Sequence, residues 1–566
     1  MPETETDYTR RIGLAIVALG MLVYANTLNS EFVWDDASSI LLHQSVQEPS
    51  SLPRLFKEDQ HAYAGGQGNF YRPLLATSFM LDFWLSYSGP TIHESTRVTT
   101  ELSPLIFHID SIFWHCLAAF FLMLILRNFS APVTIYAAVP MIYVLHPLHT
   151  EAVAYISGRA DSMSAAFMFA GLYFATRKSK EGDTWLSGAI VLLCFSAALL
   201  SKESSFIFPA LLTVAYFAYN KTCDQKWYPI QWAALAGTAI ILSVYGFLRT
   251  GNRPLNFGSD TQPPDTSIIE RVGETAQSFA YYLQLLFAPA HLHMERTLDN
   301  ATLTTTAIGC LSLLVCLSVV GVALRRKQYR IFLAAAWFLL TWLPISGLFP
   351  LNAPMAEHWM YVPMGGFLWM CLELILYSLP EKMPTGYHNR YRLVVGAIIC
   401  LWSGFLAMVS IERNLDWRSN QSIYEATLRE NPKSSRVHFN LAVTYQDLLD
   451  NEDGAKRHYT QVITLYKEKK ARDPARESEF WDEEIQSHFS LGQIFLERKQ
   501  YNDAARHFGI LSTISPVDSN RDIVALSLYG LGQCFRYSGD PNQAQQLFKR
   551  AIEIQPSLAP QIQAQL

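Results

Sequence analysis

The sequence has little charge for its length. Of 566 residues only 16% are Asp, Glu, Lys or Arg, whereas 50% are hydrophobic. Soluble domains carry about 25% charged residues, so this balance indicates several membrane spans. The formal net charge of -5 provides no basic excess for binding nucleic acid, and the sequence therefore argues against a nucleic-acid partner.

Cysteine is also scarce. The 8 cysteines show neither zinc-ligand spacing nor a regular disulfide pattern. Most of them fall in apolar runs, where single cysteines are usually inert packing groups. The sequence therefore predicts neither a structural zinc site nor a disulfide framework.

What the sequence does have is a series of apolar runs long enough to cross a membrane. The first follows a basic pair and lacks a small-residue cleavage site, so we interpret it as a retained span and not a removed signal peptide. Including it, we expect about eleven spans. Their approximate ranges are 12–28, 104–126, 131–147, 160–176, 185–200, 206–219, 230–248, 304–324, 331–349, 359–379 and 393–411.

Basic clusters predict the orientation of these spans. The clusters include Arg10 with Arg11, RKSK at 177–180, RRKQYR at 325–330 and HNRYR at 388–392. All fall on one side if the N-terminus is cytoplasmic, where Lys and Arg are enriched. The run at 278–293 is apolar enough for a twelfth span, but counting it would put RRKQYR outside. We therefore expect an interfacial or re-entrant helix there, ended by Pro289.

This topology places five polar stretches on the far side of the membrane, together with the C-terminal region. The stretches are VWDD (33–36), HPLHTEAVAYISGRAD (146–161), SKESS (201–205), the loop from Arg249 and PMAEHWMYVP (354–363). Nearly all residues with acid, base or anion-binding chemistry thus share one face.

After Ile411 the composition becomes polar and a helical repeat emerges. On a 34-residue helix-turn-helix template, Leu491, Gly492, Phe495, Ala504, Phe508 and Pro516 recur in register as Leu531, Gly532, Phe535, Ala544, Phe548 and Pro556. The pattern resembles tetratricopeptide repeats, in which these positions form the core between helices. We expect about three units, and divide the chain into a membrane domain at 1–412, with an external loop at 30–103, and a repeat domain at 413–566.

The adjacent carboxylates Asp35 and Asp36 have two interpretations. They could cap an interfacial helix, because the free N–H groups at a helix start attract a carboxylate. One Asp suffices for a cap, and the second therefore favours a catalytic base.

The segment His146, His149 and Glu151 carries side chains that bind metals. Pro147 interrupts the helical His-x-x-His geometry that such a site would need, so we predict no metal here. Three further charged pairs stand at the membrane edge: Arg159 with Asp161, Lys202 with Glu203, and Glu357 with His358. Exposed ion pairs add little stability, whereas ionisable groups at bilayer depth usually pair, face a cavity or act, so both interpretations stay open.

The order of the motifs resembles a known family. FVWDD after the first span is followed by YRPLLATSFMLDFWL, LIFHIDSIFWH, HPLHTEAVAYISGRADSMSAAF, SKESSFIFP, YYLQLLFAPAHL, AEHWMYVP and RNLDW. The series is similar to the transmembrane-and-tetratricopeptide-repeat O-mannosyltransferases and their bacterial relatives, over nearly the whole chain. This resemblance implies an all-α GT-C glycosyltransferase fold, a polyprenyl-phosphate sugar donor and a protein hydroxyl acceptor, which the repeats would engage. The short array and the histidine-rich HPLHTE and AHLHMER look more like the bacterial branch. That branch would place the chain in an inner membrane with periplasmic repeats, the alternative being the endoplasmic reticulum with lumenal repeats.

The resemblance also implies roles for residues. A lipid-phosphate leaving group needs charge neutralisation, whereas an acceptor hydroxyl needs a general base, here Asp35 or Asp36. The candidate cations for the donor phosphate are Arg72, Arg159, Lys202 and His358. The donor-binding set is completed by Glu151, Asp161, Glu203 and Glu357, which would orient sugar hydroxyls or those cations, and by His146 and His149. We expect inversion at the anomeric carbon and no metal or other cofactor.

Two other functions fit the sequence. An oligosaccharide transferase or ligase would use a lipid-diphosphate donor and would call for a divalent cation near Asp35 or Glu151. A non-catalytic membrane scaffold or transporter would use the repeats to recruit an envelope protein. Transport would spread charge along the depth of the spans, whereas the charged residues here gather at one edge.

Overall fold

The computed structural model describes residues 5–63, 70–86, 102–177, 185–250, 268–298, 301–348, 351, 353–382, 384, 387–472, 481–517 and 520–564. The chain divides into two compact units, Met1–Ser419 and Asn420–Leu566. Within the described ranges there is no strand, only an isolated bridge between Arg296 and Met355, so the all-α class is confirmed. Most of the loop that follows Arg249 (251–267) and part of the RKSK cluster (178–180) lie outside the described residues.

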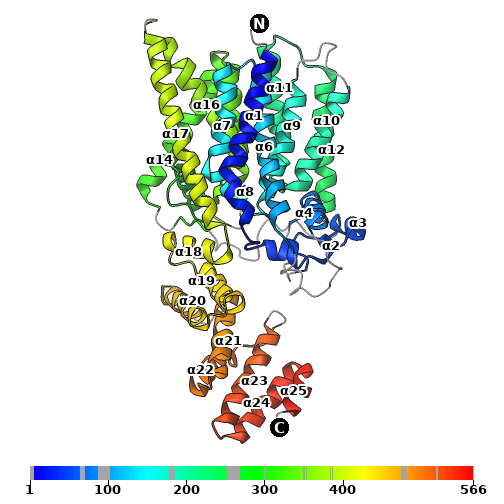
Figure 1. Ribbon diagram of the computed structural model, residues 1–566, viewed down its shortest axis with the longest axis vertical. Coiled ribbons are helices and arrows are strands. Elements are labelled where there is room, and N and C mark those ends of the chain that lie inside the picture. The colour runs from blue at the N-terminus through cyan, green and yellow to red at the C-terminus, as the bar shows by residue number, and fades with distance from the viewer. Residues whose placement is uncertain are drawn as a thin grey trace. The chain divides into compact units, whose positions relative to one another are not determined.

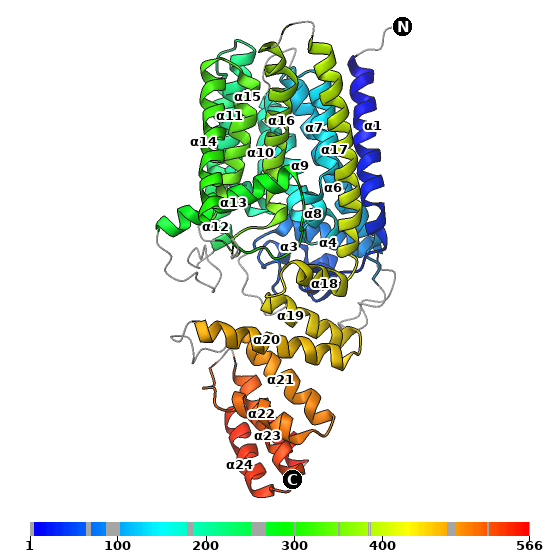
Figure 2. The same ribbon diagram turned by 90° about the vertical axis from the view of Figure 1, so that its left-hand side faces the viewer.

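The first unit is a bundle of long helices that run roughly parallel or antiparallel to one another (Figures 1 and 2). Each predicted apolar run coincides with a helix: α1 (Glu5–Tyr24), α6 (Leu105–Asn128), α7 (Val133–Leu145), α9 (Arg159–Thr176), α10 (Trp185–Ser201), α11 (Phe208–Thr222), α12 (Pro229–Thr250), α14 (Leu303–Arg325), α15 (Tyr329–Trp342), α16 (Tyr361–Glu373) and α17 (His388–Asp416). Six helical segments are long and apolar enough to cross a membrane: Tyr8–Asn29, Leu105–Asn128, Pro229–Thr250, Leu303–Arg325, Glu357–Ser378 and His388–Asp416.

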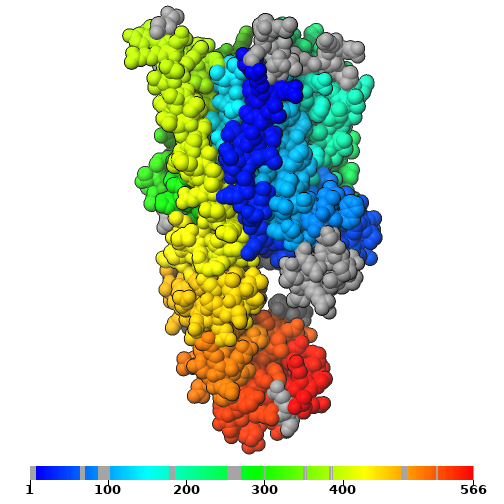
Figure 3. Space-filling view, viewed as in Figure 1, coloured from blue at the N-terminus to red at the C-terminus, as the bar shows by residue number. Residues whose placement is uncertain are grey.

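The bundle has a packed interior and an apolar outer surface. Trp337 and Trp369 are fully buried, whereas Leu303 of α14 and Leu401 of α17 are 86% and 75% exposed. Exposed leucines around long apolar helices are expected when lipid is the solvent. Helices α15 and α16 approach closely at Gly366, where a Cβ atom would lie 2.7 Å from the backbone oxygen of Ala334. Figure 3 shows α1 and α17 side by side on one face.

Helix α13 (Ile268–Phe287) includes most of the apolar run at 278–293, which we expected to form an interfacial or re-entrant helix and not a twelfth span. It runs obliquely to the long helices (Figure 2) and is not among the helices long and apolar enough to cross a membrane. Its Phe279 and Tyr282 are buried, while Ile269 is exposed. The helix ends shortly before Pro289, as expected. Its interfacial or re-entrant placement in the membrane stays a prediction.

Short elements gather at one end of the bundle and carry the polar loops (Figure 1). They comprise η1 (Ala25–Asn29), η2 (Ala37–Leu41), α2 (Gln44–Gln47), α3 (Leu52–Leu55), α4 (Pro73–Ser86), η4 (Pro147–His149), α8 (Thr150–Ala154), η5 (Glu203–Ile207) and η7 (Glu357–Met360). The bundle thus supplies a rigid base on which the candidate site is built.

The second unit consists of helix pairs preceded by α18 (Asn420–Glu430) and followed by α25 (Ala559–Gln563). The pairs are α19 (Ser435–Val443) with α20 (Glu452–Arg472), α21 (Asp482–Glu497) with α22 (Tyr501–Leu511), and α23 (Arg521–Tyr537) with α24 (Pro541–Ile554). A Cβ atom on Gly492 would lie 2.6 Å from Phe508, and one on Gly532 equally close to Phe548. The predicted small-to-large packing is confirmed in these two repeats.

Candidate active site

Asp36 anchors the loop that follows α1. Its Oδ1 accepts hydrogen bonds from the Ser157 N–H (2.8 Å) and from Ser157 Oγ (2.6 Å), and its Oδ2 accepts one from the Val33 N–H (3.0 Å). The side chain is fully buried. Burial raises the pKa of Asp36 to about 7, although these hydrogen bonds favour the charged form. Asp36 makes no side-chain cap at the start of η2, so its role is to fasten this loop to the turn before α9.

Asp35 is the more accessible carboxylate of the pair. The residue is half-buried. Its backbone oxygen accepts hydrogen bonds from the Ser39 N–H (2.9 Å) and from Ser38 Oγ (3.0 Å), which hold the backbone at the start of η2. A partly exposed carboxylate on a fixed backbone can meet a substrate, whereas the enclosed Asp36 cannot do so without loop movement.

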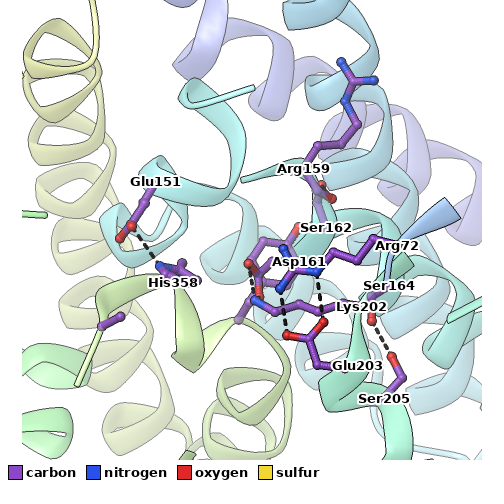
Figure 4. Close-up of polar contacts among 12 residues, drawn as sticks. Arg72, Glu151, Arg159, Asp161, Ser162, Ser164, Lys202, Glu203, Ser205 and His358 are labelled. Carbon is purple, nitrogen blue, oxygen red and sulfur yellow. Dashed lines mark hydrogen bonds and ion pairs between the residues drawn. The ribbon is translucent and has the colours of Figure 1, made fainter. Parts of the chain in front are cut away.

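Four charged residues form two ion pairs beside one another (Figure 4), and we refer to them as the ion-pair cluster. Arg72 donates to Glu203 from Nε (2.9 Å) and from Nη2 (2.7 Å). Lys202 Nζ donates to both oxygens of Asp161, at 2.6 and 2.7 Å. The side chains are 9–25% exposed, so the cluster lies at the edge of the protein interior.

The ion-pair cluster contains two cations and two carboxylates, so its formal charges cancel. Burial alone would raise the pKa of Glu203, yet the adjacent Arg72 guanidinium outweighs it and lowers that pKa to about 2. Glu203 therefore stays ionised. An ammonium has three N–H groups and a guanidinium has five. Among the described residues, side-chain partners use two donors of Lys202 and three of Arg72, fewer than each group carries.

A hydrogen-bonded path joins the ion-pair cluster to the loop of Asp35. Arg72 Nη1 donates to Gln60 Oε1 (3.2 Å), and Gln60 Nε2 donates to Ser39 Oγ (3.0 Å). Ser39 in turn bonds to the Asp35 backbone. Neither Gln60 nor Ser157 was expected from the sequence, because a single Gln or Ser in a polar loop carries no signal of its partner.

Arg159 occupies a different place from the one predicted. Its guanidinium is fully buried and pairs with Asp82 (2.5 Å) and Asp110 (2.8 Å). It also donates to the Phe107 backbone oxygen (2.7 Å). In Figure 4 the side chain points away from the ion-pair cluster. Arg159 thus holds α4, α6 and α9 together, and we leave it out of the proposed phosphate site.

A second pair joins α8 to η7. His358 Nδ1 lies 2.8 Å from Glu151 Oε1, with His358 22% exposed and Glu151 almost fully buried. Figure 4 shows this pair apart from the ion-pair cluster. Neighbouring Glu357 instead accepts two hydrogen bonds from Arg296, at 2.9 and 2.7 Å, and one from the His293 N–H. Glu357 therefore fastens the segment after α13 to η7, and Arg296 is a partner that sequence reasoning missed.

The two predicted histidines of HPLHTE are core residues. His146 Nε2 lies 3.1 Å from the Leu286 backbone oxygen, and its Nδ1 accepts from the Leu148 N–H. The ring of His149 packs 4.3 Å from those of Tyr143 and Tyr361. Within the described part of the chain, no group of three or more His, Cys, Asp and Glu side chains could hold a metal ion.

Fold and site together define a class of protein: a polytopic membrane protein with paired carboxylates and cations at one edge of its bundle and a helical repeat unit after it. Comparisons with known proteins agree. A tetratricopeptide-repeat family model matches residues 525–558.

The chain is similar along most of its length to proteins named protein O-mannosyl-transferases. It is 24% identical to F38B6.6 of Caenorhabditis elegans over 79% of this chain and 62% of that protein. It is 22% identical to TMTC3 of Mus musculus over 96% of this chain and 60% of that protein. It is 23% identical to TMTC1 of Homo sapiens over 79% of this chain and 54% of that protein. The chain thus spans about 60% of the length of the first two relatives and 54% of the third.

The predicted family resemblance is confirmed. These relatives are animal proteins, and the bacterial origin suggested by the short repeat array stays a prediction. Among solved structures, an oligosaccharyltransferase from Archaeoglobus fulgidus matches at 13% identity and a TM-score of 0.39, over 80% of this chain and 58% of that one. That score is too low for a shared fold to be inferred.

Proposed function

We propose that this chain is a membrane glycosyltransferase with a GT-C-type membrane domain. It transfers a sugar, mannose or another hexose, from a polyprenyl-phosphate donor to a Ser or Thr hydroxyl of a protein. The names of its relatives support the reaction class. The observation that carries the proposal is the half-buried Asp35, on a loop that hydrogen bonds connect through Ser39 and Gln60 to Arg72.

Asp35 is the proposed general base. As the acceptor hydroxyl oxygen attacks the anomeric carbon, Asp35 takes the hydroxyl proton and the bond from that carbon to the phosphate oxygen breaks. Attack opposite the leaving phosphate inverts the anomeric configuration. Asp36 positions Asp35 by fastening the loop, because its own oxygens are occupied by Val33 and Ser157.

The departing lipid phosphate carries negative charge, which preorganised cations stabilise. Arg72 and Lys202 lie at the edge of the interior and are assigned to it. Glu203 and Asp161 hold these two cations in place. His358, oriented by Glu151, is assigned to sugar hydroxyls of the donor.

The repeat unit is the proposed binding module for the acceptor protein, since stacked helical repeats form extended surfaces suited to polypeptides. A monophosphate donor releases one phosphate group that Arg72 and Lys202 can neutralise, so we propose that transfer needs no metal. Transfer that survives chelation with EDTA would support this part of the proposal, and its loss would favour a lipid-diphosphate donor.

The function is tested by transfer in purified membranes. The assay supplies either polyprenyl-phosphate mannose or a polyprenyl-diphosphate oligosaccharide, with secretory or envelope proteins from a strain that lacks this chain as acceptors. We expect label in protein from the monophosphate donor, and none with Asp35→Asn combined with Asp36→Asn. Glu31→Gln in the same loop is the matched control and keeps activity, because Glu31 is exposed.

Three outcomes would overturn the proposal. Transfer from the diphosphate donor alone would identify an oligosaccharide transferase. Full transfer by the double Asn variant would remove the catalytic assignment of this loop, and no transfer by any form of the chain would favour a scaffold.

A further inference from the structure

Three aromatic rings from distant parts of the first unit are stacked next to the proposed base. The ring of Trp34 lies 5.4 Å from that of Tyr155 with 26° between the planes. The ring of Tyr155 lies 5.3 Å from that of Trp417 at 19°. We call these residues the aromatic stack. It connects the loop after α1, the turn after α8 and the end of α17.

The loop end of the aromatic stack is backbone-strained. Trp34 has a φ of 53°, in the left-handed region that bulky residues rarely adopt. Such a conformation is energetically unfavourable and persists only where the surroundings hold it. Trp34 directly precedes Asp35, so whatever holds the Trp34 ring also sets the direction in which the Asp35 side chain leaves the loop.

The other end of the aromatic stack is firmly held. Trp417 is fully buried at the end of α17. Asn414, one turn earlier, donates from Nδ2 to the Val23 backbone oxygen (2.8 Å), which ties α17 to α1. The Arg418 backbone oxygen accepts a hydrogen bond from the N–H of Glu31 (2.9 Å), which belongs to the loop after α1. The end of α17 is therefore a fixed support against which Tyr155 and Trp34 can rest.

The middle ring acts by packing and not by proton transfer. Burial, followed by the nearby carboxylates of Asp35 and Asp36, keeps the pKa of Tyr155 well above its usual value. Its phenol stays neutral in the working pH range. What Tyr155 contributes to the loop is its flat face.

We infer that Trp417 is a positioning residue for Asp35, acting through Tyr155 and Trp34. This inference rests on the proposed function, in which Asp35 is the base. The first helix of the repeat unit starts at Asn420, three residues after Trp417. The segment that leads into the repeats is thus the same one that supports the catalytic loop.

The test uses the full-length chain and combines a loop readout with kinetics. Trp417→Leu keeps an apolar side chain but removes the ring, and Trp417→Phe keeps a ring. We expect Trp417→Leu to lower kcat about 10- to 100-fold, because small misplacements of a reacting group have effects of this size. The KM for polyprenyl-phosphate mannose should stay unchanged, and Trp417→Phe should restore most of the rate.

Amide hydrogen exchange supplies a readout that does not depend on the reaction. In Trp417→Leu, exchange should accelerate at Val33 and Asp36, whose N–H groups bond within the loop. Trp402→Leu, a ring removal elsewhere in α17, is the matched control and should leave loop exchange unchanged. If Trp417→Leu does not fold, Tyr155→Leu against Tyr155→Phe tests the same stack, with loss expected only for Leu.

The outcomes separate the two proposals. If Asp35→Asn retains transfer, the proposed function fails whatever Trp417 does. If Asp35→Asn abolishes transfer while Trp417→Leu and Tyr155→Leu leave both kcat and loop exchange at wild-type values, the positioning role is wrong. A drop in kcat with equal loss in Trp402→Leu would also contradict it, because the effect would then be general to α17.

Discussion

Asp36 and Ser157 are joined by two hydrogen bonds although they lie 121 residues apart in sequence. The Ser157 N–H and Oγ both donate to Asp36 Oδ1, at 2.8 and 2.6 Å. A buried carboxylate is stable only when such donors replace water. This link sets the position of the whole loop, and with it the direction of Asp35.

Ser157→Ala removes one of the two donors. Hydrogen bonds to charged groups contribute about 1.5–3 kcal/mol, so we expect a lower melting temperature and a partial loss of transfer. Thermal unfolding in detergent measures the first and the transfer assay the second. Ser196→Ala is the control, since among the described residues that hydroxyl bonds only to its own helix backbone at Leu192. Equal melting temperatures for Ser157→Ala and wild type would contradict the anchoring role.

Arg72→Lys keeps a positive charge but loses the planar guanidinium that donates from two nitrogens to Glu203 and from the third to Gln60. An Arg to Lys change is not conservative at such a site. We expect about a 10-fold or larger fall in kcat/KM for the donor, equivalent to about 1.4 kcal/mol or more of transition-state stabilisation. Arg54→Lys on the exposed surface of the same external loop is the control. Unchanged kcat/KM for Arg72→Lys would remove Arg72 from the phosphate site.

Arg159 is expected to matter for folding and not for chemistry. Arg159→Met leaves Asp82 and Asp110 without their buried cation, and breaking a buried pair in this way costs about 3–5 kcal/mol. Combining Arg159→Met with Asp82→Asn and Asp110→Asn should restore folding and retain transfer. A well-folded but inactive triple variant would contradict this purely structural role and favour a role for Arg159 in donor binding.

The repeat unit should lose stability in acid. His438 and His458 face each other through Nδ1 atoms 2.9 Å apart, and His488 and His507 do the same one repeat later. Burial, then the partner histidine, lowers the pKa of His458 to about 4, and the same causes act on His488. The unfolded chain, with pKa values near 6.5, binds protons that the folded unit rejects, so stability falls as pH drops from about 6.5 towards 4.

Hydrogen exchange of α19 to α22 in the full chain at pH 7 and pH 5 measures this effect. Other charges near these rings are Arg457 and Glu425 beside His458, Lys470 beside His488, and Arg506 and Asp503 beside His507. His458→Phe together with His488→Phe should flatten the pH dependence, because the His458 ring already stacks on Tyr445 and the His488 ring already packs against the His507 ring. Equal protection at both pH values in the wild-type chain would contradict the prediction.

The sequence predicted the parts of the fold that one-dimensional patterns determine. A membrane span requires a long apolar run, so the apolar runs predicted the spanning helices. Positions such as Gly492 and Phe508 recur as Gly532 and Phe548, and this recurrence predicted the repeats. The partners of individual side chains could not be predicted from the sequence. Arg159 looked like a phosphate ligand because Asp82 and Asp110, which neutralise it, come from other helices. His146 and His149 looked like site residues because burial within a bundle leaves no local signature.

Asp35 and Asp36 could be recognised as a pair but not told apart. Both are acidic, adjacent and external, and only the tertiary contact with Ser157 distinguishes the anchor from the accessible carboxylate. The same holds for the path through Gln60, which exists only once the loop is folded against Arg72.

The most direct measurement is transfer from polyprenyl-phosphate mannose by Asp35→Asn and Asp36→Asn, each alone, with melting temperatures recorded alongside. Asp35→Asn should fold normally and lose about 10²- to 10⁴-fold in kcat, the usual contribution of a general base. Asp36→Asn should melt lower, because its new NH₂ group faces the Val33 N–H, and should keep part of its activity. A fully active Asp35→Asn enzyme, or a stable Asp36→Asn enzyme without activity, would contradict the account.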